Sequence, residues 1–161
     1  MTSHGLPNVF EMENAPLDLA QVDPKWLRET LDASGIRWRV TVISSCYSGS
    51  FVPALQDENT LIITASAADR QSFGCSSESD YTYFGRAFFD QAMREQNSIQ
   101  GAFNQAKETV AKWENTQGFE PSEPQWSIGK NMQFMLPQLE QRLFPPVTTA
   151  PAQQEQIEAK L

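Results

Sequence analysis

Short apolar runs and longer segments with helical spacing alternate along this chain. Residues 37–44 and 60–65 are rich in β-branched and apolar side chains, which is typical of parallel strands covered by helices. Before the first run, Asp23 and Pro24 predict a helix start, because Asp caps free N–H groups and Pro fits the first turn. Gly35 predicts the end of that helix. Alternation of strands and helices is typical of βαβ units, so we expect an α/β fold.

The second half of the chain is predicted to be mostly helical. One helix is expected from about residue 82 to 95, with Phe84, Phe88 and Ala92 at four-residue spacing. Another begins at Ser98, and its apolar face comprises Ile99, Ala102, Phe103, Ala106, Val110 and Trp113. The remaining expected elements are a short strand at 9–12 within a small hairpin, a strand at 125–128, and a terminal helix at 132–143 that Pro137 interrupts.

The first apolar run leads into a turn that contains a cysteine, Ser45-Cys46-Tyr47-Ser48-Gly49. Ligands of open α/β sheets bind beyond the carboxyl ends of the strands, so we expect Cys46 to lie where a substrate can reach it. Its small neighbours leave the sulfur accessible, and Gly49 allows the backbone to approach a substrate closely. A thiol nucleophile needs a base, and the chain has a single histidine, His4. The competing interpretation of the cysteine alone is an inert core thiol.

Composition narrows the classes of protein that fit. A chain of 161 residues with 40% hydrophobic content is expected to form one domain with a modest core. Its net charge of −8 argues against a nucleic-acid partner, since phosphate binding needs a cationic face. No stretch is apolar and long enough to span a bilayer. One histidine and two cysteines make a poor zinc site, so no metal or cofactor is expected, and Cys75 is predicted to be a packed loop thiol.

Four segments in order resemble one family of enzymes. They are Thr2-Ser3-His4-Gly5, then Ser45-Cys46-Tyr47-Ser48-Gly49, then the strand and loop at 60–75, and finally Tyr83-Phe84-Gly85 before a helix. A histidine some way upstream of the cysteine is typical of caspases. Together the segments resemble the caspase-fold cysteine peptidases, and within them the legumain-like family, most closely its bacterial members. The resemblance runs from His4 to about Gly129.

The resemblance implies a caspase-like three-layer α/β/α fold with a mostly parallel sheet. In that fold the histidine follows the third strand, so the first strands are expected to be missing and the chain to be the C-terminal part of a longer protein. The strand at 37–44 would then have an exposed edge, through which a homo-oligomer could form. We expect the peptidase domain to occupy residues 1–144 and residues 145–161, rich in Pro, Thr, Ala, Gln and Glu, to form a disordered tail.

The resemblance also assigns catalytic roles. Cys46 would attack the scissile carbonyl, His4 would carry the proton to the leaving amine, and the N–H groups of Gly5 and Cys46 would stabilise the oxyanion. The substrate would be a protein or peptide. The expected substrate-binding residues are Ser44, Ser45, Ser72 and Arg86.

Two of those residues depart from the family pattern. Ser44 and Arg86 occupy positions that are acidic in relatives that cleave after asparagine. A guanidinium there would suit an acidic side chain in the substrate, because Arg pairs with carboxylates bidentately. The alternative is that Arg86 lies on the outer face of its helix and pairs with Asp90.

Two other functions are compatible with the same residues. Transamidases and peptide ligases of this family share its histidine and cysteine, and differ in whether water or an amine resolves the thioester. The chain could also be a non-catalytic scaffold that retains the fold. The compartment is undetermined by the sequence, although bacterial relatives are often exported or membrane-anchored through upstream segments.

Overall fold

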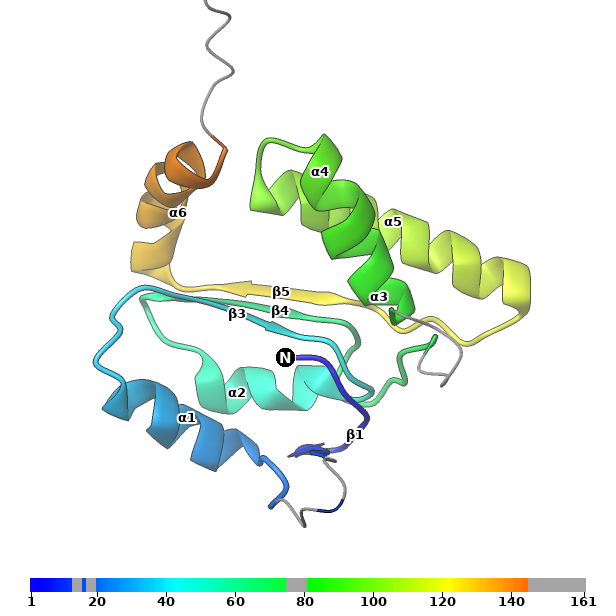
Figure 1. Cartoon of the computed structure of the whole chain (residues 1–161), viewed down its shortest axis with the longest axis horizontal. Coiled ribbons are helices and arrows are strands. Elements are labelled where there is room, and N and C mark those ends of the chain that lie inside the picture. The colour runs from blue at the N-terminus through cyan, green and yellow to red at the C-terminus, as the bar shows by residue number, and fades with distance from the viewer. Residues whose placement is uncertain (13–15, 17–19, 75–80, 145–161) are drawn as a thin grey trace, which may run out of the picture.

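A central sheet with helices on both faces forms the core of the protein (Figure 1). The computed structural model describes residues 1–12, 16, 20–74 and 81–144. The sheet contains β3 (Arg39–Ile43), β4 (Thr60–Thr64) and β5 (Gln125–Ile128), in the order β3-β4-β5. The pair β3 and β4 is parallel, and the pair β4 and β5 is antiparallel. The predicted α/β fold and its three strands are confirmed, and within the described residues the sheet is mixed.

One face of the sheet is covered by α1 (Pro24–Ala33), the 3-10 turn η1 (Ser48–Phe51) and α2 (Val52–Leu55). The predicted start of α1 is confirmed, because the Asp23 carboxylate accepts a hydrogen bond from the Trp26 N–H at 2.8 Å. Its predicted end is confirmed by Gly35, whose φ of +70° favours glycine. The core on this face is formed by Phe10, Val22, Leu27, Ile43, Phe51, Leu55 and Ile62.

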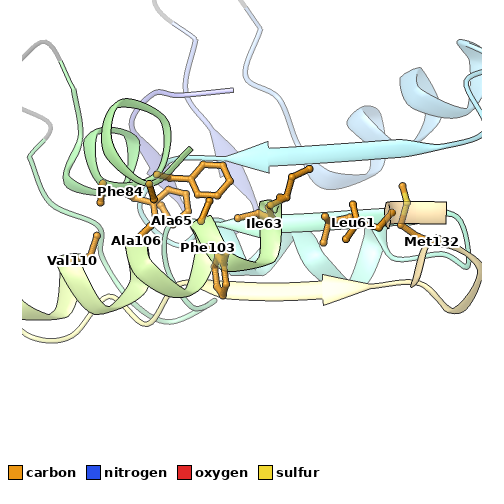
Figure 2. Close-up of a cluster of buried hydrophobic side chains, with 14 residues drawn as sticks. Leu61, Ile63, Ala65, Phe84, Phe103, Ala106, Val110 and Met132 are labelled. Carbon is orange, nitrogen blue, oxygen red and sulfur yellow. The ribbon is translucent and has the colours of Figure 1, made fainter. Parts of the chain in front are cut away.

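The opposite face is covered by a continuous helical segment and by two further helices, α5 (Ile99–Gln117) and α6 (Lys130–Leu143). The helical segment consists of α3 (Tyr83–Gly85), the π-helical η2 (Arg86–Ala92) and α4 (Met93–Glu95). Leu61 and Ile63 of β4 belong to the core on this side (Figure 2). Ile62 belongs to the core on the other side. All five residues of β4 are buried, as expected for a strand covered on both faces.

The predicted interruption of the last helix at Pro137 is wrong. Helix α6 continues through Pro137 to Leu143. A proline at this position removes one backbone donor and leaves the carbonyl of Gln133 without its usual partner. Both Gln133 and Pro137 are exposed, so water can solvate that carbonyl.

The N-terminal residues pair with the end of β3. The Met1 amine donates to the Val42 carbonyl at 2.9 Å, and the Ser44 N–H donates to the Met1 carbonyl at 2.8 Å. Thr2 and Ser44 form a parallel bridge. The edge of β3, which we expected to be exposed, is therefore covered at its carboxyl end. After this segment, β1 (Gly5–Leu6) and β2 (Val9–Phe10) form the predicted hairpin. The strand expected at 9–12 is the shorter β2, and β1 was not predicted.

An ion-pair cluster ties α1 to β3. The Asp32 carboxylate accepts hydrogen bonds from Arg28 Nε at 2.7 Å and from Arg39 Nη1 at 2.8 Å. These two hydrogen bonds hold the pKa of Asp32 below its ordinary value of 3.8. The stabilisation is therefore fully present above the unfolded carboxyl pKa and is lost as the pH falls through the lower folded pKa.

This cluster predicts a modest acid dependence of stability. Asp32→Asn removes the titrating group, so we expect the loss of Tm between pH 7 and pH 3 to shrink by about 1–2 °C relative to the unsubstituted chain. Thermal unfolding followed by circular dichroism measures this difference. Glu108→Gln, at an exposed position of α5, is the control and should leave the loss unchanged. An equal loss of Tm in the Asp32→Asn chain would contradict the prediction.

Candidate functional site

His4 and Cys46 follow the carboxyl ends of neighbouring parallel segments at the same rim of the sheet. Residues 1–3 run parallel to the end of β3, and each segment leads directly into one of the two residues. The two loops are in contact, because a Cβ atom on Gly5 would lie 2.6 Å from the Cys46 carbonyl oxygen and 2.9 Å from Ser45 Oγ. His4 is exposed, and Cys46 is half-buried. The rim therefore brings an accessible imidazole and a thiol onto adjoining loops.

Backbone hydrogen bonds hold the His4 loop in this place. The Ser3 N–H donates to the Ser44 carbonyl at 3.2 Å, and the Glu11 N–H donates to the His4 carbonyl at 3.1 Å. At the tip of the hairpin, the Asn8 N–H donates to Ser50 Oγ at 2.9 Å. The hairpin is therefore fastened to the β3 end and to η1, the two elements that flank Cys46.

Cys46 lies in a sharp turn between β3 and η1. The next residue, Tyr47, has a φ of +56°, a left-handed conformation that costs about 1–2 kcal/mol for a residue other than glycine. This conformation is fixed by hydrogen bonds from the Tyr47 N–H to the Arg70 carbonyl at 2.8 Å and from Ser50 Oγ to the Tyr47 carbonyl at 2.6 Å. Strained residues held in this way cluster at active sites, where they aim a neighbouring group.

In the described part of the chain, the sulfur of Cys46 forms hydrogen bonds with one residue, Ser72. Cys46 Sγ donates to the Ser72 carbonyl at 3.2 Å, and the Ser72 N–H donates to Sγ at 3.3 Å. The Cys46 N–H, by contrast, has no hydrogen-bond partner within residues 1–12, 16, 20–74 and 81–144. An unpaired N–H beside a thiol leaves a donor available for a substrate oxygen.

A buried serine network fixes the base of the turn. Ser66 Oγ donates to the Ser45 carbonyl at 3.1 Å, and the Ser48 N–H donates to Ser66 Oγ at 3.1 Å. The close approach predicted at Gly49 exists, but its neighbour is protein backbone: a Cβ there would lie 2.6 Å from the Ala68 nitrogen. The expected substrate contact at Gly49 is therefore wrong, because this residue packs the turn against the loop after β4.

The predicted substrate-binding serines surround Cys46, but their side chains are buried. Ser44 Oγ lies 2.8 Å from Thr82 Oγ1, which also caps α3 by accepting from the Gly85 N–H. Ser45 is fully buried, and Ser72 is 7% exposed. In this arrangement these residues can meet a peptide mainly through their backbone groups.

Arg86 is the first residue of η2 and is exposed. Its guanidinium carbon is 5.9 Å from the ring centroid of Trp113. The alternative pairing with Asp90 is wrong, because Asp90 instead pairs with Arg94 at 3.0 Å. Arg86 therefore faces α5 and is kept apart from that ion pair.

Sequence reasoning missed the segment between α5 and β5, which braces the Cys46 site. Phe119 stacks on Phe73, with ring centroids 4.3 Å apart. The Ser122 carbonyl accepts a hydrogen bond from the Ala67 N–H at 2.8 Å. The buried Glu114 in turn accepts from the Ser122 N–H at 3.1 Å. Glu114 follows Val110 on the apolar face of α5. A carboxylate on a buried face needs a hydrogen-bond donor, and this was the one signal in the sequence that a neighbouring segment packs there.

A metal-binding cluster and a membrane-spanning helix are both absent from the residues that the structure describes. No group of three or more His, Cys, Asp and Glu side chains in this part of the chain is arranged to hold a metal ion. None of its helices combines the length and apolarity that a membrane crossing requires. The predicted packing of Cys75 and the predicted tail at 145–161 both lie outside the described residues.

Comparison with known proteins identifies one family. The model of the Peptidase C13 family matches residues 1–135, which contain both loops of the rim and all three strands of the sheet. A search of the curated proteins finds no match.

Proposed function

Because the chain belongs to the Peptidase C13 family, the legumain family of cysteine peptidases, we propose that it cleaves peptide bonds as an endopeptidase through a dyad of His4 and Cys46. The observation that carries this proposal is the contact between the two loops, where Gly5 lies against the Cys46 carbonyl. A nucleophile and a base on adjoining loops is the arrangement that acyl transfer needs. The boundaries of the peptidase domain, 1–144, remain a prediction.

In the first half of the reaction, the Cys46 thiolate attacks the scissile carbonyl carbon. The carbonyl electrons move to oxygen, and the N–H groups of Gly5 and Cys46 donate to that oxyanion. Collapse of this intermediate breaks the C–N bond, and the His4 imidazolium gives its proton to the leaving amine. The product is a thioester on Cys46.

In the second half, water resolves the thioester. Neutral His4 takes a proton from the water while the water oxygen attacks the acyl carbon. The N–H groups of Gly5 and Cys46 stabilise the second oxyanion, as they did the first. The C–S bond then breaks and the peptide acid leaves. Cys46 is again a thiolate, and His4 is again an imidazolium. The Ser72 N–H, 3.3 Å from Sγ, orients the sulfur in both steps.

Selective alkylation tests this assignment. We expect iodoacetamide near neutral pH to modify Cys46 about tenfold faster than Cys75, since a catalytic thiol is the more reactive one. Mass spectrometry of tryptic peptides measures both rates, and cleavage of a fluorogenic peptide library should be lost in proportion to modification of Cys46. Equal, slow rates at the two cysteines and an absence of cleavage would instead support a non-catalytic scaffold.

The same assay separates hydrolysis from transamidation. The thioester is common to both reactions, so glycinamide added to the reaction competes with water for it. We expect peptide acids as the main products. Peptide amides formed in proportion to glycinamide, with little acid, would identify the chain as a transamidase or ligase.

A further inference from the structure

A pocket of about 280 Å³ lies where the start of the α3–η2 segment meets the last turns of α5. Its walls are aromatic, formed by Tyr81, Tyr83 and Trp113. Two cationic side chains, Arg86 and Lys112, also line it. The pocket carries these two cations although the net charge of the chain is −8. Of its lining residues, Arg86 is the one that the sequence predicts to bind substrate.

The aromatic walls hold one of the cations in place. Tyr83 packs edge-on against Trp113, with ring centroids 5.5 Å apart, and the Arg86 guanidinium lies over the same indole. Stacking on an indole limits the motion of a guanidinium and leaves its N–H groups at the ring edge available to a ligand. Within the described residues, neither Arg86 nor Lys112 takes part in an ion pair. The pocket therefore offers two positive charges to a ligand.

The pocket adjoins the proposed site of cleavage. The Tyr83 N–H donates to the Phe73 carbonyl at 2.9 Å, and Phe73 directly follows Ser72, the residue bonded to the Cys46 sulfur. On the other side, Thr82 contacts Ser44, two positions before Cys46. An extended peptide advances about 3.3 Å per residue, so a side chain a few positions from the scissile bond can reach this pocket.

We propose that this pocket receives a glutamate or aspartate side chain of the substrate, paired with Arg86 and Lys112. This inference rests on the proposed peptidase function. A carboxylate can accept hydrogen bonds from the guanidinium in a bidentate pair, and the lysine adds a second, non-directional charge. The aromatic walls pack on the methylene groups of the same side chain, which favours a charged residue with an apolar stem.

The test is a set of fluorogenic peptides that differ at one position at a time. Each position, from four residues before the cleaved bond to two after it, holds Glu, Gln, Asp or Asn in turn. We expect one position at which the acid is preferred to its amide by about tenfold in kcat/KM, as a charge-assisted pair provides. Arg86→Gln and Lys112→Gln should each reduce that ratio, and the double variant should bring it close to one. Arg94→Gln, an exposed arginine of α4 that pairs with Asp90, is the matched control and should keep the ratio.

A binding measurement separates this inference from the catalytic one. Cys46→Ala removes the nucleophile, and tryptophan fluorescence then reports binding of the Glu and Gln peptides, since Trp113 lines the pocket. Preferential binding of the Glu peptide, lost in the Arg86→Gln background, supports the pocket even if no peptide is cleaved. Cleavage without any acid preference, a preference that survives both pocket substitutions, a preference for aromatic residues at that position, or no binding of either peptide overturns it.

Discussion

Replacing Cys46 by serine is expected to lower kcat/KM for peptide cleavage on the order of 10⁴-fold while leaving the fold intact. A serine hydroxyl is nearly the size of the thiol, and the Ser72 carbonyl and N–H that bond to Sγ can bond to it as well. The proton of a serine hydroxyl is far harder to remove than that of a thiol, so the serine is a much weaker nucleophile beside the same imidazole. The steady-state rate on a fluorogenic peptide measures the loss, and thermal unfolding checks the fold.

Cys75→Ser is the matched control, because it removes the other thiol of the chain by the same exchange of atoms. We expect full activity in that variant. Retention of cleavage in the Cys46→Ser chain, or its loss in the Cys75→Ser chain alone, would show that the nucleophile lies elsewhere.

The elements of the fold could be predicted because their signals are local. Asp23 and Gly35 mark the ends of α1, and the spacing of Ile99, Ala102 and Phe103 marks the buried face of α5. The continuous apolarity of 60–64 predicted a strand buried on both faces. The pairing of His4 with Cys46 was predicted from the single histidine and from the family resemblance. The parallel segment that carries His4 along the end of β3 had no signal in the sequence.

The contacts that brace the site could not be predicted in this way, because they join residues far apart in the chain. Phe73 stacks on Phe119, and Ala67 bonds to Ser122, and neither pair has a local pattern. Gly49 is a further example. A glycine indicates that another group approaches its backbone closely, but only the fold shows that this group is the backbone of Ala67 and Ala68. Arg86 likewise had two interpretations, a substrate carboxylate and Asp90. The structure excludes only the pairing with Asp90, which binds Arg94, and its position over Trp113 had no signal in the sequence.

Replacing Gly5 by alanine should separate the two catalytic loops and lower kcat/KM by about 100-fold. The added Cβ would lie 2.6 Å from the Cys46 carbonyl oxygen, a contact with backbone that a side-chain rotation cannot relieve. One of the loops must therefore move by a fraction of an ångström to an ångström. Such a shift changes the distance between His4 and Cys46 and displaces the Gly5 N–H from the oxyanion, so it acts on the transition state more than on substrate binding.

The loss should therefore fall mainly on kcat, with KM little changed, and steady-state kinetics over a range of peptide concentrations distinguishes the two. Gly35→Ala is the matched control: its φ of +70° makes alanine unfavourable by about 1 kcal/mol, yet no atom lies within 4 Å of the added Cβ. We expect that control to lower Tm slightly and to keep kcat. If Gly5→Ala keeps its kcat while remaining folded, the His4 and Cys46 loops do not act together, and the dyad loses the observation on which it rests.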